Sequence, residues 1–438
     1  MDIRQFSVRD TSEASKVVSI LREDVGSSRI SQTVSDIIAD VAAKGDQAVI
    51  DLTRKFDSES IARPEDIIVS EDDIETAYSR MNASSIKALK VSARQIREFS
   101  RSQISRFKEI SFRSPLGFTI SESYAPFESV GGYVPGGLAA YPSTVLMICI
   151  PAKEAGVHEI VITSPPRKDG TLPDSVLAAA KIGGASKIYK IGGAQAIAAM
   201  ALGSDLIHKV DIVVGPGNEY VTEAKRQLSM AGKVLIDGLA GPTELLVIAD
   251  ESAKSEYIAE DLISQAEHGN RTLCGVATTS EEILRSVLEA VSSKVSDRPR
   301  MEFISKSVFF GVLASNEALL IEFSRLFSPE HLEVMTIDSK KFARKISSNA
   351  GLVLLGDYAP CSSSDYIVGT NHILPTGGEA AFHSGLSVSR FLKRSTMVSG
   401  NSDTLRKGSR FISTLAMMEG FPNHAAAPLS RFVRRKAR

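Results

Sequence analysis

The chain has 438 residues, more than one hydrophobic core usually supports, so we expect two or more domains. Its 51 Lys and Arg residues nearly balance 52 Asp and Glu residues, which argues against nucleic acid as a partner because no net positive field attracts a polyanion. The three cysteines are far apart and form no Cys-x-x-Cys pair, which argues against a disulfide framework or a thiolate zinc site and predicts a reducing, cytoplasmic environment.

Neither end of the sequence predicts a membrane or nucleic-acid partner. The first ten residues carry charges where a signal peptide needs an apolar core, and the longest apolar run, Val145–Ile150, is too short to cross a bilayer. We interpret the basic run from Arg431 to Lys436 as a solvated chain end.

The first hundred residues predict helices. Between residues 31 and 56, apolar side chains such as Val34 and Val41 recur at helical spacing, and Gly45 separates two helices of a hairpin. Apolar positions from Ile86 to Ile96 predict another amphipathic helix. No catalytic signal precedes about residue 125.

After that point, short β-branched runs alternate with Ala-rich helical stretches, the pattern of parallel βαβ units. We therefore predict two α/β domains, each with a mostly parallel sheet. The expected strands are Val145–Ile150, Ile160–Thr163, Ile188–Ile191, Val210–Val214, Val234–Ile236, Leu245–Ile248, Val308–Leu313, Leu332–Met335 and Leu352–Leu355.

Glycine turns at strand ends form the first candidate site: Gly131–Gly137, Gly192–Gln195 and Gly215–Asn218. Glycine there lets backbone amides approach a phosphate near a helix N-terminus. None of the turns reads GxGxxG, and tight turns also use glycine for steric reasons, so nucleotide binding and a structural role both stay open.

Polar residues form three further candidates. Gln265 and His268 share one face near the end of a helix that begins at about Ser255, and suit either a metal or the helix dipole. Glu330-His331 suits acid–base work or an exposed turn. The segment 362–384 reads as an ordered functional loop, in which Asp365 is a metal ligand or a helix cap and His372 or His383 is a loop-stabilising donor.

These motifs, in this order from about residue 30 to the C-terminus, resemble the histidinol dehydrogenase family. The matching stretches are Tyr133–Met147, Gly192–Ala198, Gly215–Asn218, Tyr220–Lys225, Ala240–Glu244, Gln265–His268, Ser328–Glu333, Asp365–Tyr366, Gly369–Thr376, Glu419–Gly420 and His424.

The resemblance implies a four-electron oxidation of L-histidinol to L-histidine through L-histidinaldehyde, with two NAD molecules reduced, at the end of histidine biosynthesis. It implies one Zn²⁺ per subunit, and a homodimer with shared active sites. Glu330 and His331 would be the catalytic acid–base residues. The implied zinc ligands are Gln265, His268, Asp365 and His424, the last from the partner subunit.

The resemblance also implies binding positions. Tyr133, Gln195 and Asn218 match NAD contacts. Thr243 and Glu419 match substrate contacts, while His372 either takes part or only orders its loop. The zinc ligands and His331 would also touch the substrate.

The implied fold has two incomplete Rossmann-like domains and helical arms at both chain ends in an intertwined dimer. Residues 1–25 would form the N-terminal arm, and residues 26–132 with 245–386 the larger domain, which carries most zinc and catalytic residues. Residues 133–244 would bind NAD, and residues 387–438 would reach the partner subunit.

Three positions depart from the family pattern: Thr243 where serine is common, Ser364 where glycine is frequent, and Arg390 where an acidic residue is usual. They bear on substrate fit, so a related zinc- and NAD-dependent dehydrogenase of another primary alcohol is the alternative. A catalytically silent protein that keeps the fold and thiol catalysis through Cys149 or Cys361 are further alternatives.

Overall fold

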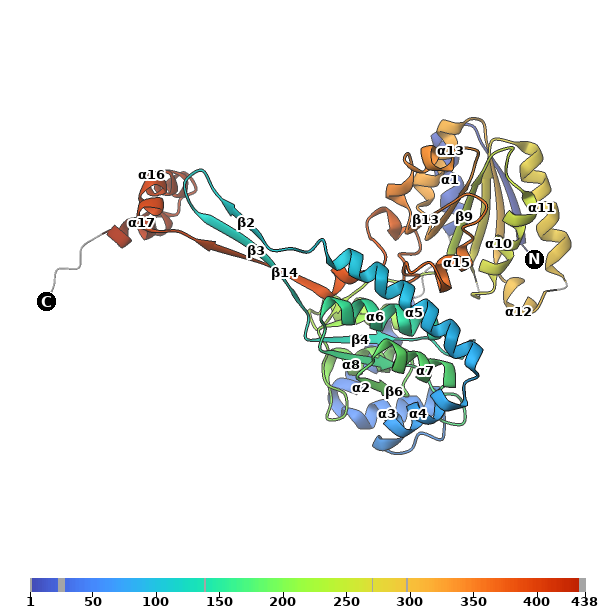
Figure 1. Ribbon diagram of the computed structural model, residues 1–438, viewed down its shortest axis with the longest axis horizontal. Coiled ribbons are helices and arrows are strands. Elements are labelled where there is room, and N and C mark those ends of the chain that lie inside the picture. Colours follow the sequence, from blue (N-terminus) through green and yellow to red (C-terminus); the bar gives the residue numbers. More distant parts are fainter. Residues whose placement is uncertain (1, 23–27, 138, 270, 297, 433–438) are drawn as a thin grey trace. The chain divides into compact units, whose positions relative to one another are not determined.

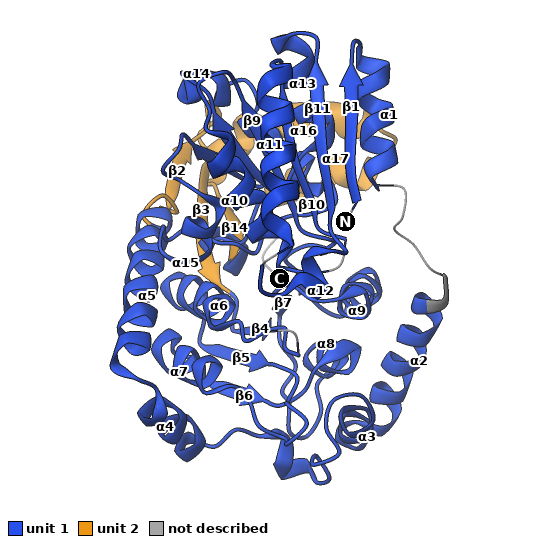
Figure 2. Cartoon of the chain, turned by 90° about the vertical axis from the view of Figure 1, so that its right-hand side faces the viewer, with its two compact units in different colours: residues 1–104, 127–391 blue, residues 105–126, 392–438 orange. Residues whose placement is uncertain are grey.

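The computed structural model describes residues 2–22, 28–137, 139–269, 271–296 and 298–432. The chain divides into two compact units (Figure 2). Unit 1 comprises Met1–Ile104 and Phe127–Phe391, and unit 2 comprises Ser105–Pro126 and Leu392–Arg438. Unit 1 contains two parallel sheets covered by helices (Figure 1), so the predicted α/β class with mostly parallel sheets is confirmed.

The first sheet has six parallel strands in the order β1-β11-β10-β9-β12-β13. Its strands are β1 (Asp2–Val8), β9 (Glu244–Ala249), β10 (Leu273–Thr278), β11 (Val308–Ala314), β12 (His331–Met335) and β13 (Leu352–Leu355). Its helices are α1 (Thr11–Arg22), α10 (Ser255–Ala266), α11 (Glu281–Val295), α12 (Met301–Ile304), α13 (Glu317–Phe327), α14 (Ser339–Ala343) and α15 (Cys361–Tyr366).

The burial of strand β9 on both faces shows that this sheet lies between two apolar cores. All six of its residues are buried, and alternate side chains enter different cores. Leu245 and Val247 pack in one apolar cluster, whereas Leu246 and Ile248 pack in another. A strand buried on both faces reads as a continuous apolar run, which is the pattern that predicted it.

The second sheet has five parallel strands in the order β6-β5-β4-β7-β8. Its strands are β4 (Ser129–Tyr133), β5 (Glu159–Thr163), β6 (Lys187–Tyr189), β7 (Ile212–Val214) and β8 (Leu235–Ile236). Helices α6 (Pro142–Ala155), α7 (Asp174–Gly183), α8 (Gly193–Leu202) and α9 (Glu219–Met230) connect or flank them.

The expected strand at Val145–Ile150 is wrong, because these residues lie within helix α6. The helix begins at Pro142, whose fixed φ suits the first helical turn, and most of its residues are buried. A helix buried on all sides has no polar face, so its sequence lacks the 3.6-residue pattern and resembles a buried strand.

The N-terminal segments divide between the lobes differently from the expected boundaries. Residues 2–22, expected as an arm, form β1 and α1, and β1 pairs with β11 along its whole length. The predicted hairpin is confirmed as α2 (Ser28–Lys44) and α3 (Asp46–Phe56). With α4 (Glu71–Arg80) and α5 (Ala83–Ile104), these helices pack on α6–α9 of the five-stranded lobe, since side chains such as Val34 join the apolar core of α8 and α9.

Unit 2 is an antiparallel sheet with two helices. Its strands lie in the order β14-β3-β2, with bounds Leu392–Ser399, Thr119–Pro126 and Ile110–Arg113. Helices α16 (Ser402–Met418) and α17 (Pro422–Leu429) pack against each other. Most of the basic C-terminal run, from residue 433 onward, lies outside the described residues. Among the helices that the structure describes, none has the length and apolar character needed to cross a membrane.

Candidate active site

A cavity of about 970 Å³ in unit 1 collects most of the predicted site residues. Its wall includes Tyr133 and Asn218 from the five-stranded lobe and Thr243, Glu330 and His331 from the six-stranded lobe. This volume lies within the usual range of ligand pockets. The five-stranded lobe contributes the carboxyl ends of its strands, and the six-stranded lobe contributes the amino ends.

On the five-stranded side, the wall is built around one close backbone approach. Tyr133 ends β4, and Gly215 follows β7 with a φ of 114°. A Cβ atom on Gly215 would lie 2.1 Å from the carbonyl oxygen of Tyr133, so only glycine fits there. Asn218 then caps helix α9, accepting hydrogen bonds from the amides of Tyr220 and Val221 at 3.1 Å each.

A buried ion pair, which our sequence reasoning missed, braces this turn. The Lys225 ammonium lies 2.7 Å from Asp237 and donates to the carbonyl oxygen of Gly215, while the second Asp237 oxygen accepts from the Gly215 amide at 2.7 Å. Lys225 follows Val221 by four residues on a buried helix face, and a lysine at such a position was the available signal.

On the six-stranded side, Glu330 and His331 stand at the amino end of β12. Helix α13 ends at Phe327, Ser328 adopts a left-handed conformation with φ 42°, and Pro329 prevents the helix from continuing. The chain therefore turns directly into Glu330, so the pair does not form the exposed turn that was the alternative; both side chains are buried.

Hydrogen bonds fix the Glu330 carboxylate. Its Oε2 atom accepts from the Thr243 hydroxyl and, at 3.0 Å, from the Glu244 amide. Burial raises the pKa of Glu330, but His331 and these two donors favour the carboxylate more, so its pKa lies below the usual value. Glu330 is thus ionised at neutral pH.

The His331 imidazole lies between two carboxylates. Its Nδ1 atom is 3.7 Å from Glu330 Oε2, and its Nε2 atom is 3.9 Å from Asp365 Oδ1. Burial lowers the pKa of His331, but Cys361 and Glu330 beside the ring outweigh burial, so its pKa lies well above the usual value. The ring can therefore hold a proton that the neighbouring carboxylate stabilises.

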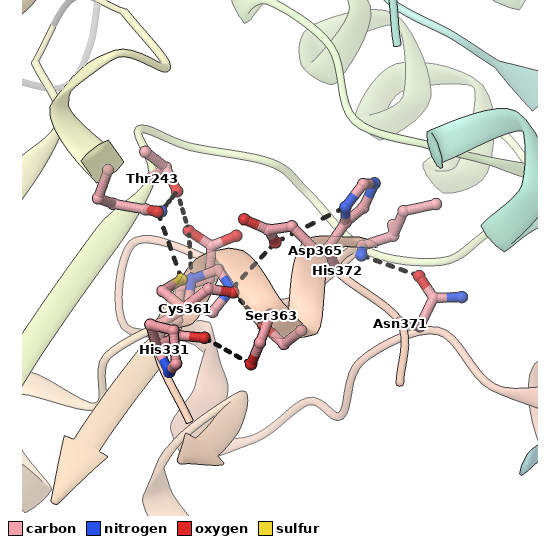
Figure 3. Close-up of polar contacts among 12 residues, drawn as sticks. Thr243, His331, Cys361, Ser363, Asp365, Asn371 and His372 are labelled. Atoms are coloured by element: carbon pink, nitrogen blue, oxygen red, sulfur yellow. Dashed lines mark hydrogen bonds and ion pairs between the residues drawn. The ribbon is translucent and has the colours of Figure 1, made fainter. Parts of the chain in front are cut away.

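Gln265, on the last turn of α10, joins Thr243 to Cys361. Its Nε2 atom donates to the Thr243 hydroxyl at 2.9 Å, and its Oε1 atom accepts from the Cys361 thiol at 3.4 Å (Figure 3). Asp365 lies on α15, whose first amide, at Cys361, donates to Glu333 at 2.7 Å. These bonds fix the amide of Gln265 and the helix that carries Asp365.

The described residues bring three of the four expected zinc ligands to one cavity: Gln265, His268 and Asp365. His268 is exposed in the turn after α10, before Gly269 with a φ of 130°. The fourth ligand, His424, and the expected substrate contact Glu419 belong to unit 2.

Two of the predicted site residues, His372 and Gln195, contact neighbouring side chains of the same chain. His372 lies 3.0 Å from the Thr144 hydroxyl and 3.7 Å from Asp365, so it orders its loop at the cavity wall. Gln195 is buried and donates to Asp57 at 3.3 Å, and it is not among the described residues that line the cavity.

The three departures from the family pattern are accommodated. The Thr243 hydroxyl keeps its bonds to Glu330 and Gln265. The buried Ser364 hydroxyl donates to the Cys361 carbonyl oxygen at 2.7 Å. Arg390 donates to the backbone carbonyl oxygens of Ile236 and Asp237.

The two cysteines considered for thiol catalysis are both unsuited to it. Burial raises the pKa of Cys149 and of Cys361 to about 12, so each is a neutral thiol near pH 7. Cys149 lies in the apolar interior of α6, away from the cavity wall.

An ion pair lies behind the acid–base residues. Arg22, at the end of α1, is 3.2 Å from the buried Glu244 and also donates to the carbonyl oxygen of Phe327. Burial raises the pKa of Glu244 to about 7, although Arg22 opposes the shift. Arg22 therefore ties α1 to the start of β9 and to the turn that leads to Glu330.

Comparison with known proteins shows the family to which the chain belongs. A family model described as histidinol dehydrogenase matches residues 21–432. Histidinol dehydrogenases of Prochlorococcus marinus and Methanocaldococcus jannaschii are 40% and 41% identical to this chain, over 97% and 98% of it and over 95% and 98% of their own lengths. A crystal structure of histidinol dehydrogenase from Elizabethkingia anophelis, 35% identical, superposes with a TM-score of 0.91 and covers 98% of this chain and 97% of that chain. These matches confirm the resemblance predicted from the motifs.

Proposed function

Because the chain belongs to the histidinol dehydrogenase family, we propose that it oxidises L-histidinol to L-histidine through L-histidinaldehyde, reducing two NAD molecules in sequence. This reaction would complete histidine biosynthesis. The observation that carries the proposal is the buried Glu330–His331 pair, which shares one cavity with Gln265, His268 and Asp365.

His331 would accept the proton from the substrate hydroxyl in the first oxidation and from the hydrated aldehyde in the second. Glu330, ionised and held by Thr243 and the Glu244 amide, would orient and deprotonate the water that adds to the aldehyde. Since both side chains are buried, solvent has little access to the intermediate, which must be retained between the two steps.

The residues present fit a zinc ion. Gln265, His268 and Asp365 offer oxygen and nitrogen donors, and Gln265 stands at the carboxyl end of α10, where the helix dipole favours a cation. With the partner subunit's His424 they would complete four ligands, one zinc per subunit. When bound, zinc would hold the imidazole and amino group of histidinol and so fix the reacting carbon.

The five-stranded lobe would bind NAD. Two features support this proposal: the strand order, 3-2-1-4-5 in chain order, matches the first five strands of the 3-2-1-4-5-6 dinucleotide-binding order, and the cavity lies at the carboxyl ends of β4 and β7. The N-terminus of α9, capped by Asn218, faces this region, and helix N-termini favour phosphate groups. Tyr133 on the wall would contact the cofactor directly, whereas Gln195 would act from behind it. NAD would take up the hydride in each oxidation.

A homodimer would complete the site through unit 2. That unit exposes large apolar side chains on its sheet and on α16, among them Phe112, Val398, Phe411 and Leu415. Exposed apolar surface of this kind favours a protein interface. Glu419 and His424 belong to the same unit, so the two residues would enter the partner's site together.

The test is the stoichiometry of NADH per L-histidinol in the zinc-loaded protein. We expect two NADH per substrate, no free aldehyde, and loss of both steps with a chelator. One NADH with aldehyde released, or a preference for an alcohol without imidazole, would favour a related dehydrogenase. No NADH from any primary alcohol would favour a silent protein.

A further inference from the structure

We propose that His331, Cys361 and Asp365 form a second cation site, made within one chain, that takes soft divalent ions such as Cd²⁺. One nitrogen, one sulfur and one carboxylate oxygen of these residues all lie within 4.8 Å of one another. All three side chains are buried. The set differs from the proposed catalytic ligands in two of its three members.

The two ring nitrogens of His331, which have no hydrogen-bond partner among the described residues, point to a ligand at this position. Neither ring nitrogen makes a hydrogen bond among the described residues, although only 2% of the residue is exposed. Buried polar atoms normally have partners, so an orphaned imidazole beside a thiol and a carboxylate needs an explanation. A cation bound to one nitrogen would give that nitrogen a partner.

The chemistry of the three donors selects the ion. Sulfur favours soft metals, and imidazole and carboxylate complete a set that suits Zn²⁺ and, because of the sulfur, Cd²⁺. A bound cation deprotonates a coordinating thiol, so a neutral thiol in the free protein is no obstacle. The thiol proton would pass to solvent through the cavity, whose wall includes His331 and Asp365.

The position of Cys361 explains why the site would oppose catalysis. Cys361 is not among the described residues that line the cavity, and its thiol donates to Gln265 at 3.4 Å. A cation held by Cys361 would occupy the lone pair of His331 and share or remove Asp365. It would thus inhibit the oxidation while the proposed NAD surface on the five-stranded lobe stays intact. This inhibition rests on the proposed function, whereas the binding itself does not.

Binding is tested by titrating the zinc-loaded full-length protein with Cd²⁺ and recording the thiolate-to-cadmium charge-transfer absorption. We expect one additional Cd²⁺ per chain with this absorption in the wild type. Cys361→Ser, which keeps the size and a donor to Gln265, should lose the absorption. Cys149→Ala and Cys274→Ala, both buried cysteines off the described cavity wall, are matched controls that should retain it.

Two further measurements separate the site from general misfolding. His331→Asn should keep the absorption but bind Cd²⁺ about tenfold or more weakly, since one ligand is lost. Inhibition by Cd²⁺, measured relative to each variant's own activity, should be about tenfold or more weaker in Cys361→Ser than in Cys149→Ala. Thermal unfolding of each variant checks that the fold is kept.

The proposal is overturned if the wild type shows no thiolate absorption, if Cys361→Ser retains it, or if either control loses it. Unchanged Cd²⁺ affinity in His331→Asn would also overturn it. Because the absorption needs neither histidinol nor NAD, a protein that bound Cd²⁺ in this way but oxidised no histidinol would refute the proposed function and leave the cation site standing.

Discussion

In the five-stranded sheet the cavity lies beyond the carboxyl ends of β4 and β7, whereas in the six-stranded sheet it lies before the amino ends of β9 and β12. The helices that end at the cavity also present opposite ends to it in the two lobes. The N-terminus of α9 serves the first side, and the carboxyl ends of α10 and α13 serve the second. One side is therefore electrostatically suited to anions and the other to cations and protons.

This contrast teaches that two similar sheets can supply different chemistry by offering opposite ends. The carboxyl-end side suits the phosphates of a dinucleotide. The amino-end side suits a metal ion and a histidine that gains a proton. Four substitutions test this division.

The largest effect is expected from His331→Asn on the amino-end side. Loss of the proposed base should lower kcat by about 10³-fold and leave KM for NAD nearly unchanged, because the proposed cofactor contacts lie on the other sheet. Steady-state kinetics with histidinol and with histidinaldehyde measure this. A normal rate for both oxidations would refute the assignment.

Arg22→Ala should lower the free energy of unfolding by about 2–3 kcal/mol, because the buried Glu244 loses its ionic partner. The pKa of Glu244 is about 7, raised mainly by burial, so its ionised form disfavours the folded state as pH rises through that value. The loss should therefore be larger at pH 8 than at pH 6 in denaturant titrations.

The double variant Arg22→Ala, Glu244→Gln is the control for this ion pair. It should recover part of the stability and remove most of the pH dependence. If the single variant loses the same stability at both pH values, the buried charge is not the cause.

Asn218→Ala should cost about 1 kcal/mol of stability through the lost cap of α9, and should raise KM for NAD more than it lowers kcat. Asn316→Ala is the matched control, because Asn316 caps α13 of the other lobe through the Leu319 amide. That variant should lose similar stability with an unchanged KM for NAD. Equal kinetic effects in both variants would break the division between the sheets.

The smallest effect is expected from Asp57→Asn, behind the Gly192 turn. Burial raises the pKa of Asp57 to about 6, so wild-type stability is greatest below about pH 4 and falls as pH rises through 6. Asparagine should remove this fall and stabilise the protein by about 1 kcal/mol at pH 8, a value discounted for partial exposure. Unfolding at pH 4.5 should show no gain.

The sequence predicted the fold class and most strands because buried parallel strands read as apolar runs, as in β9. The strand predictions failed where an apolar run also suits a buried helix, or where glycines interrupt the run. Helix α6 lacks a polar face and resembled a strand. Strand β4 was missed because Gly131 and Gly132 interrupt it; each packs where a Cβ would lie 2.6 Å from a neighbouring side chain.

The candidate site was predicted in part from local patterns and in part from the family resemblance. The turn at Gly215 and the helix that ends near Gln265 and His268 have local signals, and the structure bears both out. The convergence of Glu330, Gln265 and Asp365 has none, since strand order and register decide it. From the sequence, Cys361 was considered only as an alternative catalytic thiol, and its contact with Gln265 follows from the packing of α15.

The pairing of β1 with β11 fixes an order of events during synthesis. Asp2 pairs with Val308, so the first strand made must wait for about 300 further residues, roughly 15–60 s at ordinary rates of translation. The five-stranded sheet draws all its strands from Ser129 to Ile236 and can assemble much earlier. The N-terminal strand must therefore stay unpaired until β11 has been made, and it can join the six-stranded sheet before β12 and β13 are synthesised.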